Sequence, residues 1–289
     1  MSDSTKNVAQ ILKIGADFLE GKNIENPRLV CEMLLSRLLG CKRLELYLKY
    51  NDELSEKRLA AMRRGIKRAA SGEPVQYIIG ETGFMDSVFK VDARALIPRP
   101  ETEVLVKSVL ECESIWQNES PAVVDVGTGS GCIVLSLASV HKNGKYLAID
   151  ISEEALSLAR ENAKKMSLSE HVHFLNADLS DVVEPESMNA IVSNLPYIPT
   201  GDCEKLATEV RDHEPRSALD GGADGLRIID AVIQDAGIVL KNDGMLFLEI
   251  GDDQGARVSS MLEASGFSDI KVLKDLNDRD RVVLGRLAI

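Results

Sequence analysis

The tetrapeptide at residues 194–197, Asn-Leu-Pro-Tyr, carries groups suited to holding a planar substrate that presents nitrogen. An amide nitrogen is a poor nucleophile because its lone pair is delocalised into the carbonyl. A site can help by placing acceptors on the two N–H bonds, here the Asn194 side-chain oxygen and a backbone carbonyl, expected to be that of Leu195. These acceptors stabilise the charge that develops on nitrogen during alkylation. The tetrapeptide therefore predicts a clamp for an amide or amino nitrogen.

The last two residues of this tetrapeptide would orient the substrate. Tyr197 can pack its ring on the planar group and fix the angle of attack, and Pro196 stiffens the turn. No general base is required before transfer, since the proton can leave the nitrogen afterwards. A proline turn with a buried tyrosine would show the same pattern without any chemistry, so the prediction needs a second motif.

That second motif is a glycine-rich turn, Gly-Thr-Gly-Ser-Gly at residues 127–131, between an apolar run and a helical pattern. Such a turn places a ligand at the carboxyl end of a strand, and its glycines let the backbone approach the ligand closely. A dinucleotide-binding fold requires the spacing G-x-G-x-x-G, whose third glycine would fall on Cys132. The spacing that ends at Gly131 instead resembles the S-adenosylmethionine loop of class I methyltransferases.

Two further predicted strands end in residues suited to a nucleoside. Asp150 closes the strand after the glycine loop, where a carboxylate can accept hydrogen bonds from both ribose hydroxyls, while Ser152 is available to cap the next helix. After the following strand, Asp178 could accept from the exocyclic amine of adenine and Leu179 could cover the ring. An ordinary polar loop would explain each residue taken singly, so the interpretation rests on their succession.

The chain before these motifs predicts a helical bundle and then a hairpin. Residues 1–72 carry apolar residues at helical spacing. We expect helix caps at Asn26, followed by Pro27, at Gly40 and at Ser55. Residues 73–98 change character and predict a linking β-hairpin, with strands at 75–79 and 88–91 and turn residues between them.

After Pro100 short apolar runs alternate with helical stretches, which implies a parallel sheet covered on both faces. The last two runs are separated by only a short polar loop, so they could pair as an antiparallel edge. The predicted strands are 123–126, 145–150, 172–176, 190–194, 245–250, 270–273 and 282–287, and the helices are 101–113, 131–140, 153–167 and 225–240.

Composition bounds the class of protein. The chain has 289 residues, 44% of them hydrophobic and 28% charged, which is typical of a globular protein with one large or two smaller domains. No secretory signal is visible at the start and no apolar stretch reaches the length needed to cross a bilayer. We therefore expect a cytoplasmic protein with no membrane partner.

The cysteines and histidines predict neither a disulfide framework nor a metal site. The five cysteines are odd in number and form no C-x-x-C pair. His171 and His173 alternate with apolar residues in a predicted strand, so two polar side chains on one strand face explain them better than a metal does.

Charge is distributed unevenly along the chain. Residues 1–72 carry 14 Lys and Arg against 9 Asp and Glu, whereas the remainder carries 20 against 37. The acidic main body argues against a broad duplex-DNA footprint. The basic N-terminal part could dock an acidic protein or RNA, and a solvated helix face explains it equally well.

With these motifs in place, the chain resembles the HemK/PrmC family, the N5-glutamine methyltransferases of bacterial peptide chain release factors. The resemblance runs over nearly the whole chain; the run 97–103 is specific, whereas the glycine loop is shared by many methyltransferases. The matching segments are 73–80 with Phe84, 96–103, 126–131, Asp150, 194–197, and parts of 214–226, 249–255 and 275–281.

The resemblance implies a class I S-adenosylmethionine-dependent methyltransferase of the α/β class. Its Rossmann-like, seven-stranded mixed sheet would follow an N-terminal helical bundle and a linking β-hairpin. The domains would be 1–72, which docks the substrate, the linker 73–98, and the catalytic domain 99–289. The donor would be S-adenosyl-L-methionine, which becomes S-adenosyl-L-homocysteine. The substrate would be the glutamine of the Gly-Gly-Gln motif in class I release factors.

The resemblance also implies roles for individual residues. The family usually has Asn-Pro-Pro-Tyr, and here Leu195 replaces the first proline, which loosens the turn but removes no proposed hydrogen-bond partner. Pro98-Arg99-Pro100 is expected to shape the site, with no bond assigned to Arg99. The cofactor would be held by Gly127, Thr128, Gly129, Ser130, Gly131, Asp150, Asp178, Leu179 and Asn194, and the substrate by Asn194, Leu195, Pro196 and Tyr197, of which Asn194, Pro196 and Tyr197 are the catalytic candidates.

Three other functions share some of these features. A glutamine methyltransferase acting on a large-subunit ribosomal protein shares the fold and cofactor, but the run 99–103 favours the release-factor enzyme. An N6-adenine methyltransferase predicts a basic cleft or a target-recognition domain, and the acidic catalytic half disfavours a nucleic-acid substrate. A non-catalytic nucleoside-binding or scaffold protein would have no need for Asn194 and Tyr197.

Overall fold

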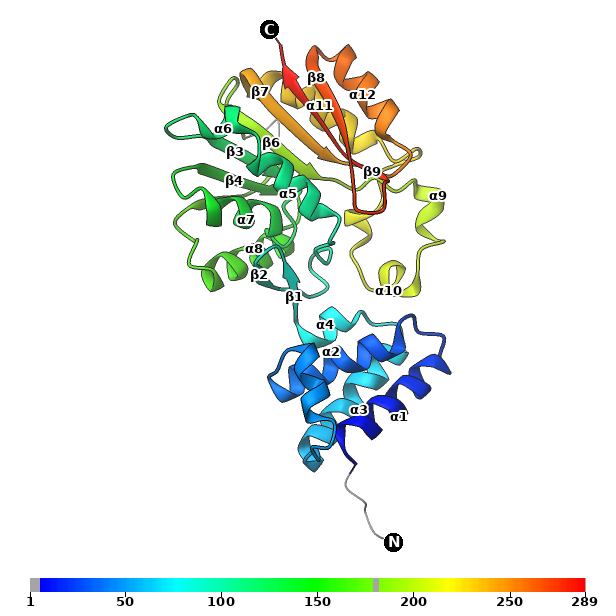
Figure 1. Cartoon of the computed structure of the whole chain (residues 1–289). Helices are drawn as coiled ribbons and strands as arrows, with labels where there is room; N and C mark the ends of the chain where they lie inside the picture. The colour runs from blue at the N-terminus through cyan, green and yellow to red at the C-terminus, as the bar shows by residue number, and fades with distance from the viewer. Residues whose placement is uncertain (1–5, 179–181, 289) are drawn as a thin grey trace. The chain divides into compact units, whose positions relative to one another are not determined.

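The computed structural model of the chain describes residues 6–178 and 182–288 (Figure 1). Within it the chain folds into two compact units. One is built from the chain up to Glu81 together with Ala207–His213, and the other from Thr82–Leu206 and the residues from Glu214 onward.

The first unit is a helical bundle with its own apolar core, to which Leu12, Leu19, Leu35 and Met62 contribute buried side chains. Helix packing is close, since a Cβ on Gly15 would lie 2.8 Å from the sulfur of Cys31. Its helices are α1 (Val8–Glu20), α2 (Pro27–Leu39), the 3-10 helix η1 (Arg43–Lys49), α3 (Glu56–Ala70), α4 (Val75–Ile79) and α10 (Thr208–Arg211).

All three predicted caps lie at helix ends, and two of them make the expected contact or conformation. Gly40 ends α2 in the left-handed conformation, with φ of 64°, and the Ser55 side chain accepts a hydrogen bond from the Arg58 backbone N–H at the start of α3. Asn26 precedes α2 and Pro27 takes the first helical position, as predicted, but the capping hydrogen bond is absent. Asn26 takes the left-handed conformation, which asparagine tolerates, and its side chain makes no capping hydrogen bond.

The strand predicted at residues 75–79 is also wrong, because this segment forms helix α4. Pro74 precedes its first turn, and Gly80 ends it in the left-handed conformation, where the Gly80 N–H donates to the Gln76 carbonyl at 2.7 Å. These start and stop signals outweigh the strand propensity of the β-branched and aromatic residues between them.

A two-stranded hairpin follows, formed by β1 (Glu81–Phe84) and β2 (Ser87–Lys90). The predicted hairpin is therefore present but shorter, and only its second strand was predicted in the right place. Phe84 and Phe89 pack edge to face, with ring centroids 6.0 Å apart, in the core of the second unit. The division between the two compact units falls inside the predicted linker 73–98.

The second unit is built on a seven-stranded mixed sheet in the order β5-β4-β3-β6-β7-β9-β8, which confirms the predicted fold class. The first five of these strands pair in parallel, and β9 pairs antiparallel with both β7 and β8. The strands are β3 (Ala122–Val126), β4 (Lys145–Asp150), β5 (Val172–Asn176), β6 (Met188–Asn194), β7 (Leu240–Glu249), β8 (Phe267–Lys274) and β9 (Asp280–Leu287).

Helices cover both faces of this sheet (Figure 1). Neighbouring residues on β3 face opposite ways: Val123 packs with residues of α5 and α7, whereas Val124 packs with residues of α11 and α12. The helices are α5 (Thr102–Leu110), α6 (Glu113–Trp116), α7 (Cys132–Val140), α8 (Glu153–Lys165), α9 (Thr200–Cys203), the 3-10 helix η3 (Arg216–Ala218), α11 (Arg227–Val239) and α12 (Gly255–Ala264).

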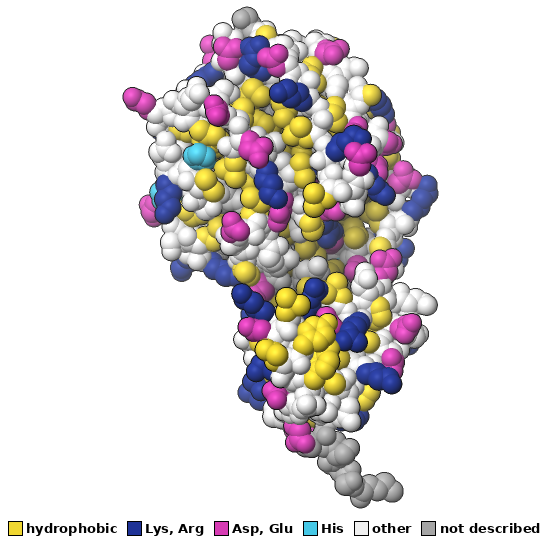
Figure 2. All heavy atoms as spheres, viewed as in Figure 1, with side chains coloured by type: hydrophobic (Ala, Val, Ile, Leu, Met, Phe, Trp, Pro, Cys, Tyr) yellow, Lys and Arg dark blue, Asp and Glu magenta, His cyan; other side chains and the backbone are white. Residues whose placement is uncertain are grey.

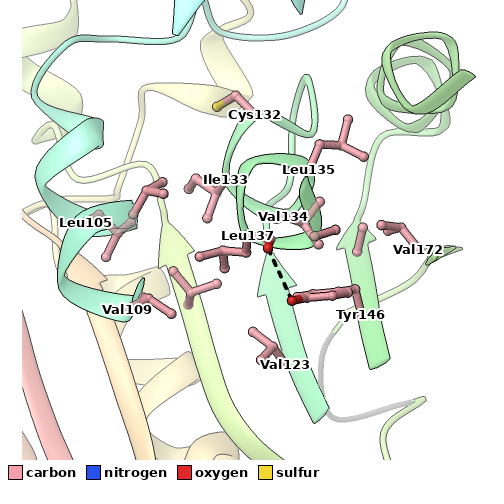
Figure 3. Packing of buried hydrophobic residues seen from close by; sticks show 14 of the residues in the cluster. Leu105, Val109, Val123, Cys132, Ile133, Val134, Leu135, Leu137, Tyr146 and Val172 are labelled. Atoms are coloured by element: carbon pink, nitrogen blue, oxygen red, sulfur yellow. Dashed lines mark hydrogen bonds between the residues drawn. The ribbon is translucent and has the colours of Figure 1, made fainter. Parts of the chain in front are cut away.

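Figure 3 shows the first of these two cores, where side chains of α5 and α7 meet those of β3 and β4. The buried Tyr146 places its hydroxyl 3.3 Å from the Leu137 carbonyl and 2.7 Å from the His141 carbonyl, to which it can donate. The packing anchors α7, whose first residue follows the glycine loop. The strand order reverses around β3, and in such sheets ligands bind in the crevice at the carboxyl ends of the strands.

Candidate active site

A cavity of about 550 Å³ opens at the carboxyl ends of β3, β4 and β6. This is the size range of pockets that hold small molecules and cofactors. Its lining brings together most of the residues predicted for the site. They include residues 93–99, Thr102, residues 126–130, Asp150, Ala177, Asp178, residues 194–196, Pro215 and Arg227.

The glycine loop turns as its sequence predicts. Gly127, Gly129 and Gly131 all have positive φ, of 69°, 56° and 79°, a conformation that costs glycine little. A Cβ on Gly131 would also lie 3.0 Å from Leu135 and 3.2 Å from Ala159, so glycine allows α7 to approach α8. Gly131 therefore shapes the loop without lining the cavity.

The buried carboxyl group of Asp125 is hydrogen-bonded to this loop and to the start of α7. Asp125 on β3 accepts hydrogen bonds from the Thr128 hydroxyl at 2.7 Å and the Val134 N–H at 3.3 Å. Its other oxygen, Oδ1, has no hydrogen-bond partner among the described residues. Burial raises the pKa of Asp125 to about 7, against the opposing effect of these hydrogen bonds. The lone acid in an apolar strand was the sequence signal for it.

Asp150 lies at the end of β4 and lines the cavity. Its two oxygens accept the Gly129 N–H at 2.8 Å and the Ser152 N–H at 2.9 Å. Burial raises the pKa of Asp150, and these backbone donors oppose the rise. Ser152 caps α8 as predicted, by accepting from the Ala155 N–H. Each carboxylate oxygen keeps a second lone pair that a ribose hydroxyl can use.

The predicted adenine region follows β5. Ala177 and Asp178 line the cavity, and the backbone there is tied to β4 because the Ala177 N–H donates to the Asp150 carbonyl at 3.3 Å. Leu179, predicted to cover the adenine ring, lies outside the described residues.

The first three residues of the tetrapeptide line the same cavity. Asn194 ends β6, and its side-chain nitrogen donates to the hydroxyl of Thr102 at 3.1 Å. This bond leaves the Asn194 oxygen as the end available to a ligand. Leu195 is buried in the core between the sheet, α11 and α12, and a Cβ on Gly127 would lie 3.5 Å from its side chain.

Tyr197 is not among the described residues that line the cavity. It packs half-buried against the second core, and its carbonyl accepts from the Gln254 side chain at 3.0 Å. Burial, and next the charge of Glu249, raise the pKa of Tyr197 to about 12. Stacking of its ring on a substrate stays a prediction.

Two glycines in the loop before α11 approach the backbone of the tetrapeptide closely. A Cβ on Gly221 would lie 2.6 Å from the Pro196 carbonyl oxygen, and one on Gly225 would lie 2.2 Å from the Tyr197 carbonyl oxygen. Any larger residue at either position would displace the tetrapeptide. Both positions therefore require glycine for steric reasons, which the sequence alone does not reveal.

The segment before α5 forms another wall of the cavity. The structure also shows the partner of Arg99, which could not be assigned from the sequence. Its guanidinium forms an ion pair with Glu214, a buried residue whose other oxygen accepts the Ile97 N–H at 3.1 Å. Glu214 thus holds residues 97–99 in place beside the cavity.

Asn162 on α8 is a further positioning residue that the sequence did not reveal. Its fully buried side chain donates to the carbonyls of Ser130, at 2.9 Å, and Lys90, at 3.1 Å, and accepts the Lys90 N–H at 2.7 Å. Asn162 therefore joins the glycine loop to β2. A polar residue on the inner face of a helix otherwise lined by Ala and Leu was the signal.

The described part of the chain contains no group of three or more His, Cys, Asp and Glu placed to hold a metal ion. All five cysteines are free thiols. No helix in residues 6–178 or 182–288 is long and apolar enough to span a membrane.

Together, the strand order, the positive-φ glycine loop after β3 and the acid that ends β4 define a class I S-adenosylmethionine-dependent methyltransferase. Family profiles agree: the PrmC N-terminal domain matches residues 10–80 and a methyltransferase domain matches residues 123–213. The catalytic domain of hMettl16, solved with the MAT2A 3′UTR hairpin 6, shares the fold, with a TM-score of 0.57 and 13% identity over 81% of this chain and 83% of that one.

Curated relatives narrow the class to one family. The release factor glutamine methyltransferase of Chlorobaculum tepidum is 38% identical over 95% of both chains. The enzyme of the same name from Moorella thermoacetica is 40% identical over 92% of this chain and 93% of its own. The chain belongs to the release factor glutamine methyltransferase family.

Proposed function

We propose that this chain transfers a methyl group from S-adenosyl-L-methionine to the side-chain amide nitrogen, N5, of the glutamine in the Gly-Gly-Gln motif of class I peptide chain release factors. The observation that carries the proposal is the orientation of Asn194. Its nitrogen is held by Thr102, so its oxygen remains for a substrate N–H. The relatives' names support the substrate.

The cavity suits the cofactor. The loop of residues 127–131 would hold the amino acid part of the cofactor, Asp150 the ribose, and Asp178 and Leu179 the adenine, with Asn194 at the reacting end. When bound, S-adenosylmethionine supplies an electrophilic methyl group on a sulfonium. The acceptor capacity of Asp150, which lines the cavity, supports the fit.

The substrate amide would be held at two points. The Asn194 oxygen and the Leu195 carbonyl would accept its two N–H bonds and stabilise positive charge on nitrogen as the methyl arrives. Pro196 would keep the turn rigid and Tyr197 would orient the planar amide. Leu195 in place of the family's proline keeps its backbone carbonyl and fills the core with its side chain.

The helical domain 1–72 would dock the release factor, with 73–98 as linker and 99–289 as the catalytic domain. Figure 2 shows hydrophobic side chains beside basic ones on the visible face of the helical unit. Exposed hydrophobic side chains of this unit include Ile14 and Phe18 on α1 and Leu44 and Leu48 on η1. We place the reaction in the cytoplasm, on a protein and not on a nucleic acid.

The test is mass spectrometry of a class I release factor incubated with the protein and S-adenosylmethionine. We expect one added methyl group, on the glutamine of Gly-Gly-Gln, and none on a release factor in which that glutamine is replaced. A large-subunit ribosomal protein in a parallel reaction tests the sister activity. If calorimetry detects cofactor binding but the release factor gains no methyl group, the substrate is rejected while fold and donor stand.

A further inference from the structure

Glu214 is a buried carboxylate that joins two walls of the cavity. The residue is only 5% exposed, and it is not among the described residues that line the cavity. Pro215, directly after it, lines one wall, and the Glu214 carboxylate contacts residues 97–99 in another. A buried charge has lost its water and needs protein partners instead, so the partners of Glu214 show what it holds.

Both partners of Glu214 lie in the segment between β2 and α5. Its oxygen Oε1 forms an ion pair with the Arg99 guanidinium, and Oε2 accepts the Ile97 N–H at 3.1 Å. Residues 91–101 form neither helix nor strand, and the prolines at positions 98 and 100 have no N–H to donate. The segment therefore depends on a side chain that lies 115 residues after Arg99 in the chain.

Further hydrogen bonds connect this segment to the proposed substrate clamp. The Arg99 carbonyl accepts the Thr102 N–H at 3.1 Å in the first turn of α5. The hydroxyl of Thr102, a residue that is 2% exposed, accepts the Asn194 side-chain nitrogen at 3.1 Å. A continuous series of contacts within the second unit therefore runs from Glu214 through Arg99 and Thr102 to Asn194.

We propose that Glu214 is a positioning residue for methyl transfer: its carboxylate fixes Arg99, and through Arg99 and Thr102 it fixes the place of the Asn194 amide in the cavity. The inference rests on the proposed function, because the place of Asn194 matters only where a substrate N–H must be accepted. Glu214 itself touches neither substrate nor cofactor in this scheme.

A purely structural role for this ion pair has different consequences. Loss of such a pair would lower the free energy of unfolding and leave the kcat of the folded molecules unchanged. In the positioning role, a displaced Asn194 oxygen would meet less well the charge that develops on nitrogen, a contact that acts on the transition state. A displacement of about 1 Å can lower turnover about a hundredfold.

The glycine loop has supports of its own. Asp150 accepts the Gly129 N–H at 2.8 Å, and the Asn162 side chain donates to the Ser130 carbonyl at 2.9 Å. Neither contact involves Glu214 or the segment that it holds. The loss of Glu214 should therefore change kcat far more than cofactor affinity.

The experiment measures kcat and KM for release-factor methylation, and cofactor affinity by calorimetry, in the wild type, Glu214→Gln and Glu214→Ala. Glutamine keeps an oxygen for the Ile97 N–H but loses the charge that pairs with Arg99, so we expect kcat to fall about tenfold. Alanine loses both contacts, and kcat should fall about a hundredfold. KM and the cofactor dissociation constant should change by less than about threefold in either variant.

A double variant tests whether Glu214 acts through Thr102. Thr102→Val removes the acceptor of the Asn194 side-chain nitrogen and should itself lower kcat about a hundredfold. Addition of Glu214→Gln to Thr102→Val should then lower kcat no further, because the contact that Glu214 positions is already lost. Additive effects of the two substitutions would overturn the proposal.

Glu204→Ala is the matched control. Glu204 also pairs with an arginine, Arg216, but the two side chains are 66% and 55% exposed, and exposed pairs contribute little. The control should keep the kcat, KM and stability of the wild type. The proposal is overturned if Glu214→Ala, shown by circular dichroism to be folded, keeps kcat within twofold. If Glu214→Ala does not fold, Glu214→Gln and the double variant decide by the same criteria.

Failure of the proposed function has a different signature. If the wild type itself methylates no release factor, the substrate assignment fails before any variant is compared. The positioning of Asn194 by Glu214 is tested only against a wild type that turns over, so the two failures cannot be confused.

Discussion

The two sides of the cavity are built in different ways. The side proposed for the cofactor is built around one short loop, in which Gly127, Gly129 and Gly131 have positive φ, and Asp150 at the end of the neighbouring strand accepts the Gly129 N–H. The tetrapeptide proposed for the substrate is held by distant segments instead, because the Asn194 side chain donates to Thr102 and the Tyr197 carbonyl accepts from Gln254. The first side therefore takes its shape from the glycines of its own loop, which Asp150 and Asn162 then hold in place, whereas the tetrapeptide has no such glycines and depends on contacts from remote segments.

This difference predicts that substitutions on the two sides will change different kinetic quantities. Losses on the cofactor side should appear as weaker cofactor binding. Losses on the substrate side should appear in turnover, because the clamp acts on charge that exists only in the transition state.

The largest effect is expected for Asn194→Ala. Removal of the acceptor should reduce kcat by about a hundredfold or more, with cofactor affinity nearly unchanged. Methylation kinetics with saturating cofactor, together with calorimetry, measure both quantities. Asn143→Ala, an exposed asparagine at the opposite end of the sheet, is the control and should behave as wild type. Unchanged turnover in Asn194→Ala would show that the amide clamp is not the mechanism.

The next effect tests whether the substrate side depends on remote packing. Gly225→Ala adds a Cβ that would lie 2.2 Å from the Tyr197 carbonyl oxygen, at a residue with φ of 77°. We expect a loss of about 2 kcal/mol or more in the free energy of unfolding, and lower kcat from a displaced tetrapeptide. Chemical denaturation measures the first and methylation kinetics the second.

Gly237→Ala is the matched control for this substitution. Gly237 lies within α11, and a Cβ there meets nothing within 4 Å. Alanine should stabilise the helix by about 0.5–1 kcal/mol and leave kcat unchanged. If both glycine variants have the same stability and kcat, the close approach of Gly225 to the tetrapeptide affects neither quantity.

A smaller effect, confined to the cofactor side, is expected for Asp150→Ala. The variant loses the acceptor of the Gly129 N–H and the proposed acceptor for the ribose, so cofactor affinity should fall about tenfold to a hundredfold. At saturating cofactor, kcat should remain close to that of the wild type. Calorimetry measures the affinity, and an unaltered dissociation constant would remove Asp150 from the cofactor site.

The same contrast explains which features could be predicted from the sequence. Alternating strands and helices, the glycine loop and the Ser152 cap follow from local patterns, and the structure contains them. Helix α4 was mistaken for a strand because the signals of Pro74 and Gly80 outweighed the propensity of the residues between them.

The supporting residues of the substrate side could not be predicted in this way. Thr102 lies 92 residues before Asn194 in the chain, and only the docking of α5 against the sheet brings its hydroxyl within hydrogen-bond distance of the Asn194 side chain. Asn162 reaches the glycine loop from another helix, 32 residues further along the chain than Ser130. Nothing in the residues adjacent to Thr102 or Asn162 indicates its partner.

The smallest effect is expected where the chain departs from its family's usual motif. Leu195→Pro restores Asn-Pro-Pro-Tyr, and Asn194 before it is already extended at the end of β6, the conformation that a following proline favours. The backbone carbonyl at 195 remains, so kcat should change by less than about threefold and cofactor affinity should not change. Because the Leu195 side chain is 5% exposed in the core, its loss should lower the free energy of unfolding by about 1 kcal/mol. Denaturation and methylation kinetics on the one variant test both statements, and a large rise in kcat would mean that the turn, and not the acceptors, limits the wild-type clamp.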